Sequence, residues 1–318
     1  MSEKVIVAVD AMGGDNAPEE IVKGAVESLQ KSGKIFIKLV GKEDAVNAEL
    51  AKYEYAKDRI EVVNATEVIE TGEPPVKAVM KKKDSSLVRA MKMVKEGQAD
   101  AVVSAGSSGA ILVGGQTIVG RIKGIERAPL APLIPTAKGQ SLLIDAGANM
   151  DAKSSYLVQF AKMGSIYMEN VVGIKNPKVA IVNVGAEEEK GNALVKETYP
   201  ILKACTDINF VGNVILKLYE GLGATLLSKI KGGLMENLRS KIGGILIKPA
   251  LKKTMKSFMS NEYGGAPLLG LNGLVVKTHG SSKSGDVCKS ILQCVTFREQ
   301  KINEKIKEKI KMEDEVQA

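Results

Sequence analysis

Residues 5–20 read VIVAVDAMGGDNAPEE: an apolar run, a glycine-rich turn and the start of an amphipathic segment. So continuous an apolar run is typical of a strand buried on both faces, as strands of parallel sheets are. Pro18 lies near the start of segment 17–30, whose apolar residues recur at helical spacing, and proline is favoured in the first turn of a helix. The stretch therefore predicts one strand–turn–helix unit of an α/β protein.

The same alternation of short apolar runs and amphipathic stretches continues along the chain, without an internal repeat. Further strands are predicted at 35–40, 60–63, 99–105, 142–146, 179–185 and 274–280, and helices at 43–52 and from 283 to the end. A chain that alternates in this way forms a mostly parallel sheet with helices on both faces. We therefore predict an α/β protein with a three-layer, doubly wound sheet.

Residues 221–260 break this pattern, because they contain no strand-like run. Apolar residues such as Leu234, Leu238 and Ile242 recur there at helical spacing among many lysines. We predict a helical arm over 221–260 that protrudes from an α/β catalytic domain formed by 1–220 and 261–318. Its apolar stripe favours a homodimer interface, and its basic surface also suits an anionic membrane, so both uses stay open.

Composition narrows the class of protein. The 318 residues carry a net charge of +8, which favours acidic partners, but they include no tryptophan and few aromatics, which argues against nucleic acid. Cys205, Cys288 and Cys294 lack the paired spacing of a zinc site, and their odd number argues against a disulfide framework. No stretch is apolar for long enough to span a bilayer. We expect a cytoplasmic protein without metal or cofactor, with peripheral contact to the inner face of the cell membrane left open.

Five predicted strands end in small or polar residues directly before a helix. These clusters are DAMGGDNAP (10–18), SAGSSGA (104–110), DAGANMDAK (145–153), NVGAEEEKGN (183–192) and HGSSKSGD (279–286). Ligands of open α/β sheets bind at the carboxyl ends of the strands, where backbone N–H groups of the turns point at the same space. We therefore expect the five clusters to line one shared cleft.

Glycines and hydroxyls in the clusters suit the binding of an anion, because glycine lets the backbone approach it closely. The first cluster is not a dinucleotide fingerprint, and the second lacks the lysine of a P-loop. A plain structural turn with Asp15 or Asn16 as helix cap explains the first about as well. The candidate phosphate- or substrate-binding residues are Asp10, Gly13, Gly14, Asp15, Ser104, Ser107, Ser108, Gly109, Asp145, Asn149, Asn213 and Ser281.

Three further residues are candidates for catalysis: Lys190, Asn192 and His279. His279 is the sole histidine, and a lone histidine is more often structural. Its position at the end of a buried strand makes a catalytic role about equally plausible. No G-x-S-x-G motif points to a serine hydrolase, and the acidic residues beside Lys190 are ordinary partners of a helix dipole.

Seven segments, taken in order, resemble the phosphate acyltransferases of bacterial phospholipid synthesis: VDAMGGDNAPEEIVKGA, AGSSGA, VGRIKGIERAPLAP, LLIDAGANMDAK, EEEKGN, NEYGGAPLLG and THGSS. The resemblance covers nearly the whole chain. It implies a fold related to phosphotransacetylases and isocitrate-type dehydrogenases, and a homodimer. The implied reaction moves a fatty acyl group from acyl carrier protein to inorganic phosphate, and a membrane glycerol-3-phosphate acyltransferase would then use the acyl phosphate.

The implied chemistry needs neither a metal nor a covalent enzyme intermediate, since phosphate is an anionic nucleophile and a thiolate leaves readily. We expect amides of the turns and Lys190 to hold phosphate, and His279 or a backbone donor to stabilise the oxyanion or to protonate the departing sulfur. Asp10, Asp145 and Asn149 would orient the cleft. Two alternatives remain. One is another enzyme of similar architecture, either a phosphotransacetylase-like enzyme acting on acyl-CoA or a dehydrogenase of the isocitrate type. The other is an inactive scaffold that binds carrier protein or membrane.

The chain departs from this family in one place. Relatives pass from a strand ending in Gly-Asn-Val through another strand and an Asp-Gly-Phe-x-Gly-Asn turn, whereas Gly212-Asn213-Val214 here continues directly into ILKLYEG. We interpret this as a jump between two similar copies, either a true deletion or a gap in the recorded sequence. A smaller change is Ser107-Ser108, where relatives often have Asn-Thr.

Overall fold

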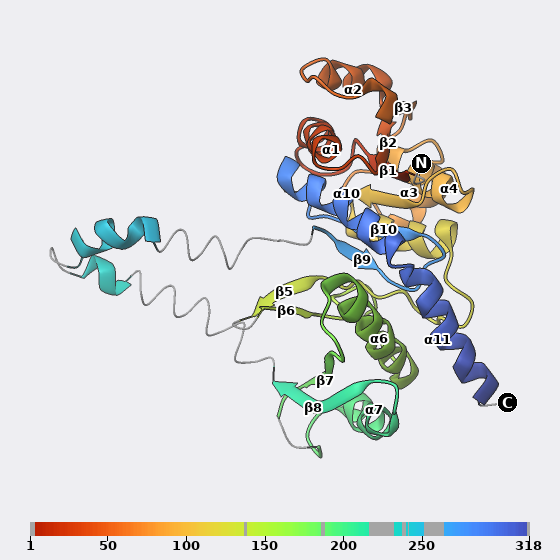
Figure 1. Cartoon of the computed structure of the whole chain (residues 1–318), viewed down its shortest axis with the longest axis vertical. Coiled ribbons are helices and arrows are strands. Elements are labelled where there is room, and N and C mark those ends of the chain that lie inside the picture. Colours follow the sequence, from red (N-terminus) through yellow and green to blue (C-terminus); the bar gives the residue numbers. More distant parts are fainter. Residues whose placement is uncertain are drawn as a thin grey trace.

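The computed structural model describes residues 4–136, 139–185, 188–215, 232–236, 240, 242–250 and 264–316. Within these ranges the strands form a six-stranded sheet and two separate two-stranded sheets (Figure 1).

The six-stranded sheet has the order β3-β2-β1-β4-β10-β9. Its strands are β1 (Val5–Asp10), β2 (Ile35–Gly41), β3 (Ile60–Asn64), β4 (Ala101–Ser104), β9 (Ala266–Leu268) and β10 (Leu274–Lys277). All neighbours run parallel except β9, which pairs antiparallel with β10. The order reverses between β1 and β4, because β1 has β2 on one side and β4 on the other. This is the position where open α/β sheets bind ligands.

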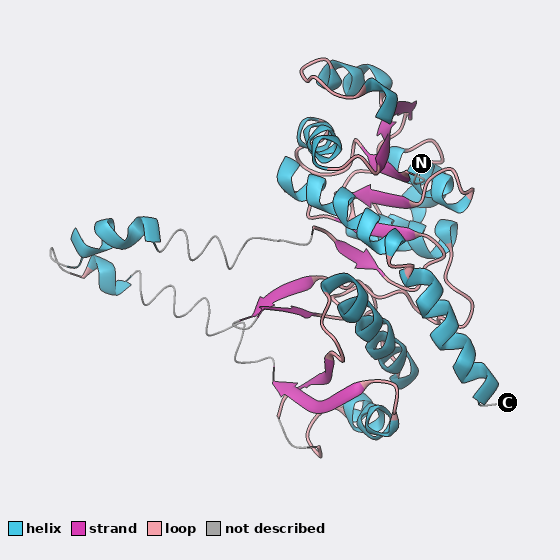
Figure 2. Ribbon diagram, viewed as in Figure 1, coloured by secondary structure: helices cyan, strands magenta, loops and turns pink. Residues whose placement is uncertain are grey.

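Helices cover both faces of this sheet (Figure 2). Alternate residues of one strand point to opposite faces, so Val7 and Val9 of β1 join one buried cluster and Ala8 joins another. The first cluster includes residues of α1 (Glu19–Lys31) and α10 (Ser284–Glu299), and the second includes residues of α3 (Pro75–Lys81), α4 (Ser86–Lys95) and α5 (Ser108–Gly114). The predicted three-layer, doubly wound α/β fold is confirmed.

The second unit holds the two small sheets. β5 (Leu133–Thr136) pairs antiparallel with β6 (Gly139–Leu142), and β7 (Lys178–Asn183) pairs parallel with β8 (Asn209–Ile215). Helices α6 (Ser154–Tyr167) and α7 (Ala193–Ala204) pack on β7 and β8 around a small core that includes Ile181 and Leu202. In Figure 1, β7 and β8 lie on the far side of β5 and β6 from the six-stranded sheet.

Outside 221–260, the described residues also form two further helices and three helical turns. They are α2 (Glu43–Leu50), the 3-10 turn Lys57–Arg59, the π-helical turns Gly115–Val119 and Met168–Val172, and α11 (Ile302–Val316). The single helix predicted from residue 283 onward is in fact two, α10 and α11, because the chain turns at Lys301, whose φ is 51°.

The strand predicted at 142–146 is largely wrong, since β6 ends at Leu142. Beyond it, Leu143 N–H donates to the Pro132 carbonyl and Ala146 N–H to the Leu130 carbonyl, so the chain continues as a turn against segment 128–132. Of the predicted arm, residues 232–235 and 242–250 are helical and lie away from the sheets in Figure 1. Apart from 236 and 240, the rest of the arm is outside the described residues. The division into an α/β domain and an arm stays a prediction.

Gly24 allows α1 and α10 to pack closely. A β-carbon there would lie 2.6 Å from the Ser284 carbonyl oxygen and 2.6 Å from Val287 Cβ. Both helices start directly after turns at the carboxyl end of the sheet, so this contact also sets the distance between those turns.

We expect Gly24→Val to lower the free energy of unfolding by about 1–3 kcal/mol, because overpacking forces the two helices apart. Urea unfolding measures the change. Gly33→Val is the matched control, since no atom lies within 4 Å of a β-carbon there. Equal stability of the two variants would contradict the close packing.

Candidate active site

Asp10 ends β1 and links it to β4. Its side chain is buried at 2% exposure, and Ser104 Oγ, at the end of β4, donates to Oδ2 at 2.7 Å. Ser104 Oγ in turn accepts from Gly106 N–H at 3.1 Å, and Met12 N–H donates to Asp10 Oδ1 at 3.3 Å. Burial raises the pKa of the Asp10 carboxyl, although hydrogen bonds from Ser104 and Ser86 oppose the rise. The two strand ends at the reversal point are therefore tied by one buried acid.

The turn after β1 lies so close to its neighbours that it requires glycine. A β-carbon on Gly13 would lie 2.5 Å from Asp10 Oδ2, and one on Gly14 would lie 2.9 Å from the Gly280 carbonyl oxygen. Gly14 also has a φ of +102°, which side chains rarely adopt. Asp15 N–H donates to the Gly280 carbonyl at 2.8 Å. The first cluster thus sits between the turns that follow β4 and β10.

His279 lies on the turn after β10 and is exposed. Its Nδ1 accepts from Ser281 N–H at 3.2 Å and lies 2.8 Å from Ser281 Oγ. Because an N–H donates to Nδ1, a neutral ring carries its proton on Nε2. The histidine therefore offers an N–H donor beside the glycine-rich turn.

Lys283 joins the turns after β1 and β10, a feature that the sequence interpretation missed. Its Nζ donates to Asn16 Oδ1 at 3.3 Å and lies 3.6 Å from Glu20 Oε1, while Asn16 Nδ2 donates to the Ser282 carbonyl at 3.3 Å. Lys283 belongs to the cluster 279–286, but the sequence of that cluster does not show that this side chain contacts the turn after β1.

The serines of the second cluster have different surroundings. Ser107 is buried and caps α5, since its Oγ accepts from Ala110 N–H at 3.4 Å. Ser108 is exposed at the start of that helix. Gly109 faces α3, where a β-carbon would lie 2.5 Å from Pro75 Cγ. Ser108 therefore offers its hydroxyl to solvent, whereas Gly109 lets two helices pack.

Asp145 and Asn149 hold the segment that runs along β9. Asp145 Oδ1 accepts from Leu130 N–H and its Oδ2 from Asn149 N–H, both at 2.7 Å, and Asn149 Nδ2 donates to the Ala128 carbonyl at 3.2 Å. Leu130 bridges to Leu268 of β9. These side chains thus connect the loop after β6 to the edge of the large sheet.

Lys190, Asn192 and Asn213 belong to the second unit. Asn192 caps α7 by accepting from Val195 N–H at 2.9 Å, and the carbonyl of exposed Lys190 accepts from Asn183 Nδ2 at 2.8 Å. Asn213 lies on β8 opposite Ile181. The structure therefore gathers the first, second and fifth clusters at one end of the large sheet, and it places the fourth beside β7 and β8.

Comparison with known proteins decides the family. The family model described as "Fatty acid synthesis protein" matches residues 5–214 and 206–305. The phosphate acyltransferase of Clostridium botulinum (strain Loch Maree) is 47% identical, over 95% of this chain and 96% of that protein. That of Clostridium acetobutylicum is 46% identical, over 95% and 98%. The chain belongs to this phosphate acyltransferase family.

Solved structures agree with the fold. The phosphotransacetylase of Streptococcus pyogenes has a TM-score of 0.59 at 18% identity, covering 93% of this chain and 94% of that one. A branched-chain phosphotransacylase from Enterococcus faecalis has a TM-score of 0.56 at 15% identity, covering 92% and 98%. The predicted likeness to the phosphotransacetylase fold is confirmed.

The family comparison also bears on the departure near Asn213. Residues 206–214 fall within both matches, so this one stretch fits two places in the phosphate acyltransferase family. Alignments with the relatives span 324 residues, although the chain has 318 and 95% of it is aligned. In the structure, β8 runs through Asn213 and Val214 as a single strand. The overlap of the two matched ranges agrees with the predicted jump between two similar copies at this point of the chain.

Within the described residues, no group of three histidine, cysteine, aspartate or glutamate side chains could hold a metal ion, and no helix has the length and hydropathy needed to cross a membrane.

The raised pKa of Asp10 predicts a pH-dependent effect of Asp10→Asn. The folded chain holds the Asp10 proton more tightly than the unfolded chain does. Asp10 therefore lowers the free energy of unfolding as the pH rises from about 4, the pKa of an aspartate in the unfolded chain, to the raised pKa in the folded chain. We expect the unfolding free energy of Asp10→Asn, relative to the unmutated chain, to increase over that window. Urea unfolding at a series of pH values measures it.

Asp84→Asn is the control with the opposite sign. Hydrogen bonds from the Thr66 side chain and backbone lower the pKa of Asp84, so its ionised form stabilises the fold at neutral pH. We expect this variant to be less stable than the unmutated chain at neutral pH, with the gap closing in acid. Parallel pH profiles for the two variants would refute the assigned environments.

Proposed function

We propose that this protein transfers a fatty acyl group from acyl-[acyl carrier protein] to inorganic phosphate, giving an acyl phosphate and free carrier protein. The 47% identity to the Clostridium botulinum phosphate acyltransferase, over 95% of the chain, carries this proposal. The meeting of three glycine- and serine-rich turns at the ends of β1, β4 and β10 supports it, since such turns suit a phosphate anion.

The reaction is a substitution at the thioester carbon. A phosphate oxygen forms a bond to the carbonyl carbon, the carbonyl oxygen takes up negative charge, and the carbon–sulfur bond then breaks. The electron pair leaves on sulfur, and the thiolate takes up a proton. Nothing is oxidised or reduced, so positioning and charge stabilisation suffice.

The candidate residues divide these tasks. Phosphate binds at the turn of Gly13 and Gly14 and at the Ser108 hydroxyl, while Lys190 supplies positive charge from the second unit. The Nε2–H of His279 donates to the carbonyl oxygen as charge develops, or to the departing sulfur. Asp10 orients the turns and does not touch the reacting atoms.

The positive charge of the chain suits binding to acidic partners. Acyl carrier protein is acidic, the chain has a net charge of +8, and many of its lysines lie in 221–260. We place carrier docking on this basic region, with the same residues serving a homodimer and contact with an anionic membrane or with the membrane glycerol-3-phosphate acyltransferase.

A second candidate function is acyl transfer between coenzyme A and phosphate, which the likeness to the Streptococcus pyogenes phosphotransacetylase favours. The assay therefore compares acyl-carrier protein with acyl-CoA of the same chain length. A clear preference for the coenzyme A thioester would replace the proposed donor.

We expect the purified chain to form acyl phosphate, measured by trapping with hydroxylamine. Lys190→Met removes a cation but keeps the aliphatic stem, so it should raise the KM for phosphate about tenfold, equivalent to about 1.4 kcal/mol. Lys196→Met, an exposed lysine on α7, is the control and should leave the KM unchanged. Unchanged phosphate dependence in Lys190→Met would remove this residue from the mechanism.

A chain that makes no acyl phosphate from either donor is the result expected of an inactive scaffold. The decisive comparison is then a chain into which the corresponding Clostridium botulinum segment is inserted between Asn213 and Val214. Activity gained on insertion would assign the defect to the lost segment, whereas continued inactivity would reject the proposed reaction.

Electrostatic docking predicts a salt effect. Raising the ionic strength from about 0.01 M to about 1 M shortens the screening length from about 30 Å to about 3 Å. We expect the KM for acyl-carrier protein to rise about tenfold, because charge attraction at long range is lost. An uncharged acyl-N-acetylcysteamine thioester is the control, and equal salt dependence of both donors would refute docking by charge.

A further inference from the structure

Lys277 is the last residue of β10, at the end of the sheet that carries the three turns. It pairs in register with Ser104 of β4, whose hydroxyl donates to Asp10 of β1. Val275, two residues earlier on β10, packs in the buried cluster that includes residues of α3, α4 and α5. Because side chains two residues apart on a strand share a face, Lys277 lies on the face that α5 covers. Asp10, Ser104 and Lys277 are thus at one level of the sheet, on three neighbouring strands.

The partly buried ammonium of Lys277 has no carboxylate partner among the described residues. Its Nζ donates to the Thr278 carbonyl at 3.2 Å, and this acceptor is neutral. Burial lowers the pKa of Lys277, and no carboxylate of the described chain raises it again. The nearby Asp10 carboxyl already accepts from Ser104 Oγ and from Met12 N–H. The ammonium is therefore available to an anion that enters from solvent.

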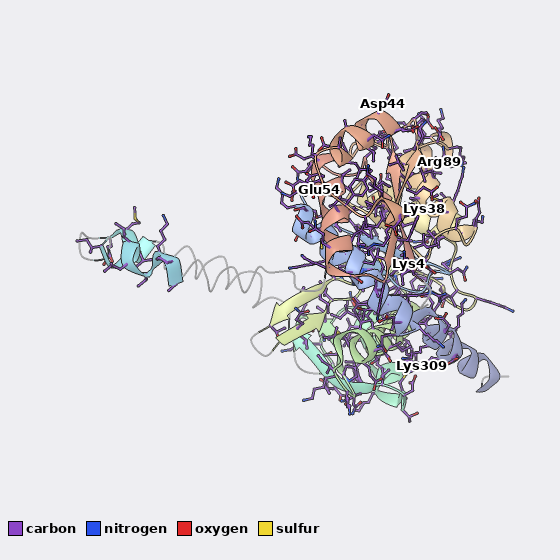
Figure 3. The ribbon with its side chains drawn as sticks, turned by 45° about the horizontal axis from the view of Figure 1, so that its top comes forward. Lys4, Lys38, Asp44, Glu54, Arg89 and Lys309 are labelled. Atoms are coloured by element: carbon purple, nitrogen blue, oxygen red, sulfur yellow. The ribbon has the colours of Figure 1, made fainter. Side chains whose placement is uncertain are left out.

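Lys38 of β2, labelled in Figure 3, shows how another lysine of this sheet is stabilised. Its side chain is 16% exposed, and its Nζ lies 3.6 Å from Glu61 Oε2 on the neighbouring strand β3. A cation that is withdrawn from water is normally paired in this way. Lys277 lacks such a partner within the described structure, at the end of the sheet where open α/β proteins bind ligands. An anion from solution would take the place that Glu61 takes for Lys38.

We propose that Lys277 binds the phosphate nucleophile through a charge-assisted hydrogen bond from Nζ to a phosphate oxygen. This inference rests on the proposed function, because it takes inorganic phosphate to be the anion of the three-turn site. Ser108, the first residue of α5, begins the helix that covers the same face, so its hydroxyl and Lys277 serve one anion. Lys277 supplies charge from the large sheet itself, whereas Lys190 belongs to the second unit.

The first test measures phosphate binding without turnover, through the melting temperature of the full chain. A ligand that binds only the folded chain raises the melting temperature as its concentration increases. We expect potassium phosphate to raise it more in the unmutated chain and in Lys38→Met than in Lys277→Met, at an ionic strength kept equal with potassium chloride. The general effect of salt is common to the three chains, so the difference reports on Lys277.

The same experiment separates binding from a structural role. Without phosphate, Lys277→Met should melt no lower than the unmutated chain, because it removes a partly buried charge that has no carboxylate partner in the described structure. A lysine that served only to hold the fold together would instead lower the melting temperature when replaced. That result, with an undiminished phosphate effect, would contradict the proposal.

A second measurement needs no variant, so it decides where Lys277→Met does not fold. Acetic anhydride acetylates the uncharged amine form of lysine, and mass spectrometry of the peptides gives the rate for each lysine in one sample. An ammonium bound to phosphate keeps its proton, so we expect saturating phosphate to slow acetylation of Lys277 at least about fivefold. Lys38, which already has Glu61 as partner, is the internal control and should react at an unchanged rate.

In an active chain, kinetics identify which substrate Lys277 contacts. Lys277→Met should raise the KM for phosphate about tenfold and leave the KM for the acyl donor unchanged. Lys277→Arg keeps a cation and should recover part of this loss. A rise confined to the KM for the acyl donor would assign Lys277 to the donor and overturn the proposal.

Two binding results would also overturn it. One is an equal effect of phosphate on the melting temperatures of the three folded chains, and the other is unchanged acetylation of Lys277 in saturating phosphate. Both readouts detect phosphate without acyl transfer. A chain in which phosphate protects Lys277 but no acyl phosphate forms would keep this binding site and reject the proposed reaction, so the two failures are distinguishable.

Discussion

The buried carboxyl of Asp10 is the constraint around which the three-turn site is arranged. A carboxyl at 2% exposure is costly to bury unless hydrogen bonds satisfy it, and Ser104 and the Met12 amide do so. This binds the end of β1 to the end of β4 at the point where the strand order reverses. The chain must then turn within reach of the same carboxyl, which only glycine at position 13 permits. The Gly280 carbonyl, which accepts from Asp15, adds the third turn.

The sequence predicted the large sheet well because its central strands are apolar on both faces. β1, β2, β4 and β10 are buried between two layers of helices, so each appears as a continuous apolar run. β5 and β9 were missed because they are short and each contains a proline, Pro135 or Pro267, which is tolerated at a sheet edge. The run at 142–146 is apolar like a strand, but its backbone N–H groups donate to carbonyls of the loop 128–132 and not to a strand. The Asp145 carboxylate accepts the Leu130 N–H, which a neighbouring strand would otherwise bind.

The sequence predicted each turn of the site, but it did not predict which turns lie next to each other. Local sequence shows where a strand ends in glycine or serine, whereas the strand order decides which ends meet, and that order depends on long-range pairing. The turns after β1, β4 and β10 are neighbours because those strands are adjacent. The cluster at 183–192 follows β7, which pairs only with β8 in the described structure, so it belongs to a different sheet. Lys283 was missed for the same reason, since its partner Asn16 is distant in sequence.

The departure from the family near Asn213 lies in the second unit and outside the large sheet. Val182 and Val214 lie side by side on β7 and β8, 43% and 48% exposed, while Ile181 on the other face is buried in the core shared with α6 and α7. Parallel sheets normally have both faces covered, so one face of this small sheet lacks a layer within the described structure. The double family match ends at Val214, in the same strand. The glycine turns, Ser108 and His279 lie on other elements, whereas Lys190 and Asn192 lie in the same unit as this departure.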